Sequence, residues 1–406
     1  MKKILLYISF CLTLFLSCTE EYIGQPSVDG TKPNTVTGVT VKNIPGGAIV
    51  HYKVPGDNNL LYVKGVYMIN GKECNTSASI YTDSLTIEGF GSAEKQIIQL
   101  YCVDRNNNVS DPVSVEINPD IPPIRSIGET FDMSVAFGGV TLKWKNDSKS
   151  MMAFYFLAEN LQTKEMEVAD IVYSNSKDGK YTLRGFDTQE RDFWCVARDR
   201  WNNYSDTIKG RFAPYYEIQV SGKNIKRVKL PGDNQTDNGD WWTFQKMFDG
   251  LIYESGGWHT YEPKAPIMFT IDLGAPTKLS RYIWWHCDPY LSHYNAKKWK
   301  MYGLKTPEEL DRLQSQHPND EDYWTSGFEK DWIKIMDCEA IPQSGSTQPT
   351  ADDKTWVKNN GLEFEVPLTT EPVRYLRFWV TETWGSGTKC NMLMVAELQF
   401  FGDIQK

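Results

Sequence analysis

The stretch Phe248–Gly274, FDGLIYESGGWHTYEPKAPIMFTIDLG, combines a turn, a tryptophan and a strand in that order. Asp249-Gly250 predicts a tight turn, because glycine accepts positive φ and aspartate can hydrogen-bond to its own backbone. The apolar run Ile267–Ile271 predicts a strand that ends at Asp272-Leu273-Gly274. Trp258, between the turn and the strand, is expected in the core. Together these features predict a strand preceded by a tight turn.

Two segments near the other end predict a pair of closing strands. They are Pro372–Phe378, PVRYLRF, and Val395–Gly402, VAELQFFG. With the first stretch they resemble a discoidin domain (coagulation factor 5/8 type C), the fold shared with family 32 carbohydrate-binding modules. The resemblance covers residues 235–403. It implies a galactose-binding-like jelly-roll sandwich that recognises a ligand, most simply a glycan.

The region before this domain contains a repeat. GGAIVHYK at 46–53 is matched by GGVTLKWK at 138–145, and DRNNNVSD at 104–111 is matched by DRWNNYSD at 199–206. The two pairs occur in the same order and at nearly the same offset, which indicates duplicated domains of about 90–95 residues. Short alternating segments between turn residues favour fibronectin-III- or immunoglobulin-like sandwiches, with Trp144 in the core of the second. The Asp-Arg-x-Asn-Asn segment is either a ligand loop or turn chemistry, and its presence in both copies favours the turn.

These observations predict an all-β chain with five parts. They are a lipoprotein signal peptide (1–17), a tether (18–32), two fibronectin-III-like sandwiches (33–120 and 121–220) and a discoidin-like domain (225–403). The last three resemble, in order, the domain-of-unknown-function families 4959, 5126 and 5000. Phrases that carry the last resemblance include Lys229–Asn234 and Gln343–Ser346. Proteins with this order look like Bacteroidetes lipoproteins of polysaccharide-utilisation loci, which work beside outer-membrane glycan importers.

The N-terminus predicts export. Met1-Lys2-Lys3 is basic and Ile4–Leu16 is apolar, too short a run for a stable membrane-spanning helix. Phe15–Cys18 resembles a lipobox, which implies lipidation of Cys18; the alternative is an ordinary signal peptide that contains a cysteine. Glu20-Glu21 resembles a surface-export signal, so we expect a lipid-anchored protein of the outer membrane that faces the cell exterior.

Composition excludes some classes of partner. The net charge of −9 argues against nucleic acid or an anionic membrane surface as the main partner. Six cysteines remain after Cys11 and Cys18, without the spacing of a zinc site, and we expect them to be small buried hydrophobes. They are Cys74, Cys102, Cys195, Cys287, Cys338 and Cys390.

Aromatic and polar residues gather in the expected loops of the third domain. Sugar binding needs flat aromatic faces for the C–H side of a pyranose and polar groups for its hydroxyls. The expected ligand-binding residues are Trp241, Trp242, His259, Tyr261, His286, Tyr290, His293, Tyr294, Arg377 and Trp384. Arg377 could instead form a structural ion pair, and Trp285 stays undecided between core and site. Trp258, Trp284, Tyr375 and Phe378 fit the core, since they alternate along strands.

Two further features could support such a site. The discoidin resemblance implies one structural calcium, held here by Asp249 and Glu397, which suits the preference of calcium for hard oxygen ligands; Glu397 could instead form a structural contact on the last strand. Within the insertion 304–332, Thr306 followed by Pro307 and acidic residues predicts a short helix. The insertion could cover the loops or merely decorate the domain.

The predicted function is capture of polysaccharide for a neighbouring outer-membrane importer, without catalysis. The sequence contains no GxSxG, HExxH or P-loop motif and no glycosidase signature. One alternative is a protein-interaction or adhesion scaffold of the importer complex, since Trp, Tyr and Arg also dominate protein interfaces. A glycoside hydrolase accessory enzyme is the less favoured alternative.

Overall fold

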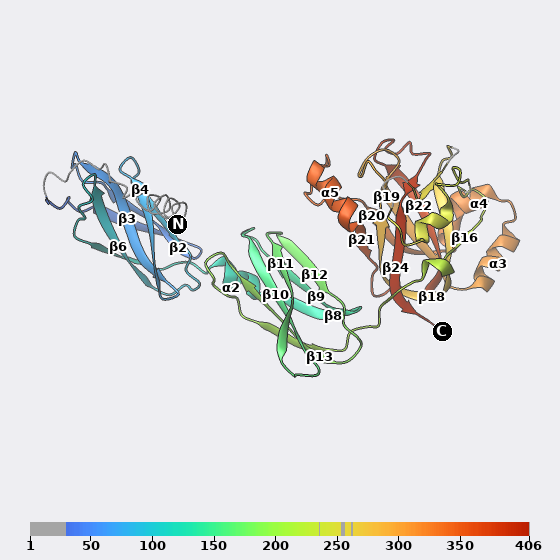
Figure 1. The fold of residues 1–406 in the computed structure, drawn as a ribbon, viewed down its shortest axis with the longest axis horizontal. Coiled ribbons are helices and arrows are strands. Elements are labelled where there is room, and N and C mark those ends of the chain that lie inside the picture. Colours follow the sequence, from blue (N-terminus) through green and yellow to red (C-terminus); the bar gives the residue numbers. More distant parts are fainter. Residues whose placement is uncertain (1–29, 235, 253–255, 261–262, 406) are drawn as a thin grey trace, which may run out of the picture. The chain divides into compact units, whose positions relative to one another are not determined.

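The computed structural model describes residues 30–234, 236–252, 256–260 and 263–405. It is an all-β protein of two fibronectin-III-like sandwiches and a discoidin-like sandwich, as expected from the sequence (Figure 1). None of the helices within these ranges is long and apolar enough to cross a membrane. Cys18 lies outside the described residues, so its lipidation remains a prediction.

The first sandwich consists of a three-stranded and a four-stranded sheet. One has the order β1 (Thr37–Ile44), β2 (Gly47–Lys53), β5 (Ser84–Glu88). The other has the order β4 (Lys72–Ser79), β3 (Leu60–Ile69), β6 (Gln96–Asp104), β7 (Val113–Ile117). Side chains alternate between core and solvent: Val50 and Tyr52 on β2 are buried, whereas His51 between them is exposed.

The second sandwich repeats this topology after a short helix, α2 (Pro123–Gly128). Its strands are β8 (Asp132–Ala136), β9 (Gly139–Lys145) and β12 (Asp178–Leu183) in one sheet, and β11 (Met166–Ser174), β10 (Met152–Glu159), β13 (Arg191–Arg198) and β14 (Ile208–Phe212) in the other. Trp144 is buried against Phe154, with 4.1 Å between ring centroids. The repeat seen in the sequence is therefore a repeat of structure.

The third domain is built on an eight-stranded sheet. Its main path is β15 (Ile218–Gln219), β24 (Glu397–Ile404), β18 (Ile267–Trp285), β22 (Val373–Thr383), β19 (Ala296–Leu304) and β20 (Ile333–Glu339), and β16 (Lys226–Val228) and β21 (Leu362–Glu365) pair with β18. A small second sheet contains β17 (Trp258–His259) and β23 (Met394–Val395). The helices are η2 (Gly222–Asn224), η3 (Phe244–Phe248), α3 (Pro307–Gln316), α4 (Glu321–Thr325), η4 (Gly327–Lys330) and α5 (Ala351–Asn360).

Strand β18 is the central element of this domain (Figure 1). The expectation that it ends at Gly274 is wrong, because the strand continues to Trp285. Its first half pairs with β16 and β22, and its second half pairs with β21 and β24. The change of partners falls after Gly274, whose φ of +87° is accessible to glycine at low cost. One strand thus serves both layers of the sandwich, and its side chains Trp284, Phe269 and Ile271 lie in the core.

The insertion forms a second hydrophobic core on the outer side of the sheet. Helix α3 begins with the expected Thr306, in a capping box with Glu309. Leu310, Leu313, Trp324 and Phe328 pack onto Met268, Tyr302 and Tyr375 of the sheet. In Figure 1, α3 and α4 lie on one side of the domain and α5 on the other.

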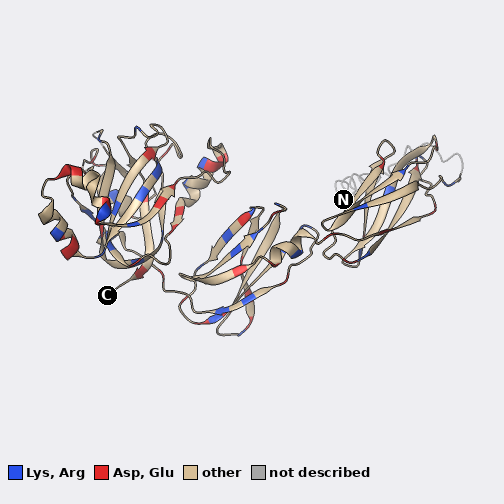
Figure 2. Cartoon of the chain, turned by 180° about the vertical axis from the view of Figure 1, so that it is seen from behind, with Lys and Arg blue, Asp and Glu red and all other residues tan. Residues whose placement is uncertain are grey.

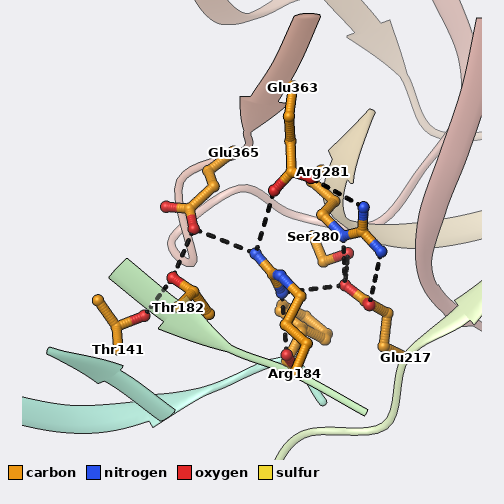
Figure 3. A network of polar contacts seen from close by, with 9 residues as sticks. Thr141, Thr182, Arg184, Glu217, Ser280, Arg281, Glu363 and Glu365 are labelled. Atoms are coloured by element: carbon orange, nitrogen blue, oxygen red, sulfur yellow. Dashed lines mark hydrogen bonds and ion pairs between the residues drawn. The ribbon is translucent and has the colours of Figure 1, made fainter. Parts of the chain in front are cut away.

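The chain divides into two compact units. One contains the chain to Met133 with Leu142–Tyr181 and Arg191–Arg211, and the other contains Ser134–Thr141, Thr182–Glu190 and Phe212–Lys406. Polar contacts hold the second unit together (Figure 3). Arg184 reaches Glu217 at 3.2 Å and Glu365 at 3.1 Å, and Arg281 reaches Glu217 at 3.2 Å and Glu363 at 3.0 Å. The side chains of Arg184, Glu217 and Arg281 are at most 18% exposed, so solvent screens these pairs only partly.

The cysteines are mostly buried, as expected, and charged residues of both signs share the surface of the third domain (Figure 2). Figure 2 shows basic and acidic residues interspersed along the strands of the third domain. The six cysteines that the structure describes are free, and all but Cys74 are buried. Burial raises the pKa of Cys195 and Cys287 to about 12, so these thiols are unreactive at neutral pH.

Candidate ligand-binding site

The structure brings three of the expected residues together around His259. The ring of Trp242 meets the imidazole edge-on with 5.6 Å between centroids, and the ring of Tyr294 stacks against it at 5.7 Å. The side chain of Asn238 lies 3.2 Å from His259 Nδ1. We call Asn238, Trp242, His259 and Tyr294 the aromatic cluster. Its members come from three separate segments of the chain, which is typical of a binding site built from loops.

Backbone contacts fix these segments. Trp242 forms bridges with Asn238 and with Gly257, and β17 pairs with β23, so that His259 lies opposite Met394. The Met394 amide donates to the carbonyl of Tyr294 at 3.0 Å. A Cβ on Gly257 would lie 2.1 Å from a backbone oxygen of Val395, so only glycine allows this close approach.

His259 lies at the centre of the aromatic cluster as a neutral ring. The residue is half-buried, and burial lowers its pKa, so the imidazole is neutral at pH 7. No described residue bonds to its Nε2 atom. Nε2 is itself buried and Nδ1 faces Asn238, so the imidazole serves the cluster chiefly as a packed ring.

Trp241 extends the cluster toward solvent. Its side chain is 69% exposed, and Lys246 Nζ lies 4.6 Å from the ring centroid. A tryptophan this exposed contributes little to the core, so its free face is available to a ligand.

Two more of the expected residues, His293 and Trp384, lie next to Tyr294. The Gly385 amide donates to the carbonyl of His293 at 2.6 Å, and the Trp384 amide donates to the carbonyl of Asn295 at 3.1 Å. His293 is exposed, while Trp384 is half-buried and packs against the core. The loops that carry His293 and Trp384 are therefore neighbours of the aromatic cluster.

The structure places His286 and Tyr290 in the interior instead of at the surface. His286 is 1% exposed, and burial lowers its pKa to about 3. Tyr290 is 6% exposed and belongs to the main core. The loop folds inward because the buried side chain of Asn295 accepts from the Cys287 amide and donates to the carbonyls of Cys287, Pro289 and Ser292. We exclude His286 and Tyr290 from the candidate site.

Arg377 is a structural residue, the alternative that the sequence left open. It is fully buried and pairs with Asp233 at 2.7 Å. It also donates to Thr270 Oγ1 at 2.5 Å and to the carbonyl of Trp324 at 2.6 Å. Burial raises the pKa of Asp233, and the guanidinium opposes that rise. Arg377 thus ties the insertion to the sheet and does not belong to the site.

Tyr261, also expected in the site, lies outside the described residues. Trp285 is 8% exposed and packs with Cys287 and Ala396, with Trp242 and Met394 against them. Trp285 therefore belongs to the small apolar cluster against which Trp242 packs. Asn238 and Asn295 were missed by sequence reasoning, because asparagines in turns usually serve backbone geometry.

Asp249 and Glu397 lie next to each other, as the calcium expectation requires. Glu397 is 1% exposed and its Oε1 accepts from the Gly250 amide at 3.1 Å, while no described residue bonds to Oε2. Burial and the nearby Asp249 raise the pKa of Glu397 to about 9. The side chains of Asp249 and Glu397 both border a cavity of about 470 Å³. A buried, unpaired carboxylate oxygen beside a second carboxylate fits a hard cation; in the described ranges no third His, Cys, Asp or Glu joins them, so further ligands would be carbonyl or water oxygens.

Three family models match this chain, one after another. Residues 33–119 match Domain of unknown function (DUF4959), residues 120–223 match Domain of unknown function (DUF5126), and residues 222–402 match the domain of unknown function DUF5000. The three families expected from the sequence are thereby confirmed. No curated protein matches the chain.

Solved structures with similarity to the chain include a SusE-like protein, BT2857. It is 24% identical with a TM-score of 0.40, over 70% of this chain and 100% of that one. A CBM32 domain of a family 31 glycoside hydrolase from Clostridium perfringens is 16% identical with a TM-score of 0.31, over 45% of this chain and 94% of that one. A two-domain fibronectin type III segment of chicken tenascin is 11% identical with a TM-score of 0.23, over 44% and 99% of the two chains.

Proposed function

We propose that this protein is a non-catalytic, cell-surface lipoprotein that binds polysaccharide for a neighbouring outer-membrane import system. The observation that carries the proposal is the aromatic cluster, in which Trp242 and Tyr294 flank a neutral His259. Aromatic rings offer flat faces to the C–H side of a sugar ring, while the carboxamide of half-buried Asn238 offers polar atoms to its hydroxyls. Exposed Trp241 would add a second stacking surface beside the first.

Lipidation of Cys18 would hold the protein at the outer face of the outer membrane. Several acyl chains anchor a protein stably, whereas one chain gives only marginal binding. The support for this anchor is the sequence Phe15–Cys18 and the resemblance to surface lipoproteins.

We also propose one structural calcium ion, held by Asp249 and Glu397. The ion would offset the two neighbouring negative charges and fix the Asp249-Gly250 turn. A Cβ on Gly257 would lie 2.6 Å from the Ala396 carbonyl oxygen, so the segment that leads to His259 touches the residue next to Glu397. Calcium would therefore stiffen the binding site without contacting the ligand.

Affinity electrophoresis of the chain from Thr19 tests the proposal against plant, fungal and host polysaccharides, with calcium and with EDTA. We expect retardation by one class of polysaccharide, and we expect Trp242→Ala and Tyr294→Ala to abolish it. Tyr81→Ala is the control, because Tyr81 is a 90% exposed aromatic residue far along the chain from this site.

Migration unaffected by every polysaccharide in both conditions would refute glycan binding. The protein-interaction scaffold would then become the favoured function, tested by co-purification with the importer complex. Retardation that survives both substitutions would keep the function but refute the assignment of the site.

A further inference from the structure

A second cavity lies in the other compact unit, between the two fibronectin-like sandwiches. Its volume is about 450 Å³, within the range of about 300–1,000 Å³ typical of pockets for small organic ligands. Apolar side chains dominate its lining, including Phe90, Pro122 and Met151. Tyr173 and Met151 at its border are 65% and 55% exposed, an unusual exposure for large apolar groups that lie together.

The walls of this cavity are held in place by the Asp-Arg-x-Asn-Asn turn of the second sandwich. Trp201 of that turn packs against the core of the first sandwich. It lies so close to Gly89 that a Cβ added there would be only 2.7 Å from Trp201 Cδ1. Asn203 is buried, donates to the carbonyl of Gly89 at 2.9 Å, and accepts from Asn70 at 3.0 Å. The equivalent of Trp201 in the first copy is Asn106, which cannot make this contact. The cavity is therefore preformed by a feature specific to the second copy.

Three of the four charged residues in the lining have polar partners within the protein, and the fourth, Arg198, places its guanidinium carbon 5.1 Å from the centroid of the Tyr155 ring. Arg200 forms an ion pair with Glu88 at 2.7 Å and covers the ring of Trp201 with 4.0 Å from its guanidinium carbon to the ring centroid. The carboxylate of Asp199 accepts from the backbone amides of Trp201 and Asn203. The exposed ends of Glu88 and Arg200 can act as hydrogen-bonding groups toward a neutral ligand.

We infer that this cavity is a second binding subsite for an uncharged stretch of a polysaccharide chain. Its exposed Tyr173 ring would stack on a sugar ring, the apolar wall would cover the C–H groups, and the Glu88–Arg200 pair would contact hydroxyls. The inference rests on the proposed function, since it assigns the same class of ligand to a second place. A polyhydroxylated ligand can hydrogen-bond to the exposed ends of Glu88 and Arg200 while it covers the apolar wall, whereas an apolar peptide could use only the wall.

Isothermal titration calorimetry with cellohexaose, xylohexaose, mannohexaose and maltohexaose tests this subsite on the chain from Thr19. Four proteins are compared: the parent, a Trp242→Ala/Tyr294→Ala double variant that disables the first site, and each of these with Tyr173→Ala. We expect the double variant to retain weak binding of a hexasaccharide, and Tyr173→Ala to weaken that binding by roughly tenfold, the effect of one stacking contact. Tyr81→Ala is the matched control, since it removes another exposed tyrosine of the same unit.

The outcomes separate the two proposals. If the double variant loses all binding and Tyr173→Ala has no more effect than Tyr81→Ala in the parent, the second subsite is refuted and the proposed function stands. If the parent binds none of the four hexasaccharides and no polysaccharide of the larger panel, both proposals fail. Hydrogen exchange gives an independent readout: saccharide should protect amides of Gly89–Phe90 and Met152–Ala153 in the double variant, and unchanged exchange there would overturn the inference.

Discussion

Replacing Arg377 by methionine should destabilise the third domain strongly, because this residue forms the structural ion pair that the sequence left open beside a role in ligand binding. The substitution leaves the carboxylate of Asp233, whose side chain is 2% exposed, without its ion-pair partner. It also removes the donors to Thr270 and to the Trp324 carbonyl. Removing one partner of a buried pair costs about 3–5 kcal/mol, because the remaining charge is left desolvated. We expect a loss of that size in the free energy of unfolding.

Arg374 on the same strand provides a matched control. It pairs with Asp272 through two hydrogen bonds of 2.8 and 2.9 Å, but the side chains of Arg374 and Asp272 are 28% and 15% exposed. Water can solvate Asp272 after Arg374→Met, so we expect a loss of only about 1 kcal/mol. Adding Asp233→Asn to Arg377→Met should recover part of the stability, since it removes the stranded charge.

Urea unfolding of the full chain at pH 7 measures these differences. Hydrogen exchange in peptides of β18 and β22 shows that the third domain is the one affected. Equal losses for Arg377→Met and Arg374→Met, or no recovery in the double variant, would refute the conclusion that Arg377 is a buried structural ion.

Three further predictions concern other parts of the molecule. The first concerns Glu397 in EDTA, where its carboxyl group has a pKa of about 9 in the folded protein and an ordinary pKa of 4.5 in the unfolded chain. Between these two values the unfolded chain has lost the proton and the folded protein has kept it. The free energy of unfolding should therefore fall by up to about 1.4 kcal/mol per pH unit across that window. Glu397→Gln should flatten this slope in thermal unfolding at pH 5–9; an unchanged slope would show that Glu397 is not the group. Because burial lowers the pKa of His259 from its ordinary value of 6.5, glycan affinity should be constant between pH 7.5 and 8.5, and a titration within that range in calorimetry would contradict the prediction. Trp201→Asn, which copies Asn106 of the first sandwich, should lower the opening free energy of the Gly89–Phe90 amides by about 2 kcal/mol in hydrogen exchange, whereas Asn106→Ala should leave it unchanged.

The strand alternation in the sequence was sufficient to predict the core. Trp258, Trp284, Tyr375 and Phe378 are all buried as expected, because their spacing reflects the two faces of a strand. The length of β18 was not predictable in the same way. Asp272-Leu273-Gly274 is typical of a strand end. The strand nevertheless continues, because β24 takes over as its partner where the pairing with β22 ends, and that pairing cannot be read from the local sequence.

The candidate site was predictable only in part. Trp242, His259 and Tyr294 meet as a loop-built site requires, but His286 and Tyr290 turn inward around Asn295, whose four hydrogen bonds have no sequence signature. Arg377 is buried because Asp233 is available to it, and that pairing depends on segments far apart in the chain. Tertiary contacts of this kind decide whether a polar residue serves structure or binding.

The polar contacts around Arg184 determine where a recombinant fragment of the third domain can begin. The DUF5000 family model starts at residue 222, after Glu217 and well after Thr182 and Arg184. A fragment cut there would keep the Arg281–Glu363 pair but lose the Glu217 carboxylate that meets Arg281, and Arg184 and the Thr182 hydroxyl that meet Glu365 at 3.1 and 2.7 Å. A fragment that starts before Glu217 keeps the Glu217 carboxylate for Arg281. Only a fragment that also carries the second sandwich keeps the contacts of Thr182 and Arg184 with Glu365. Expression trials guided by family boundaries alone would therefore produce a domain in which Arg281 has lost Glu217 and Glu365 has lost Arg184.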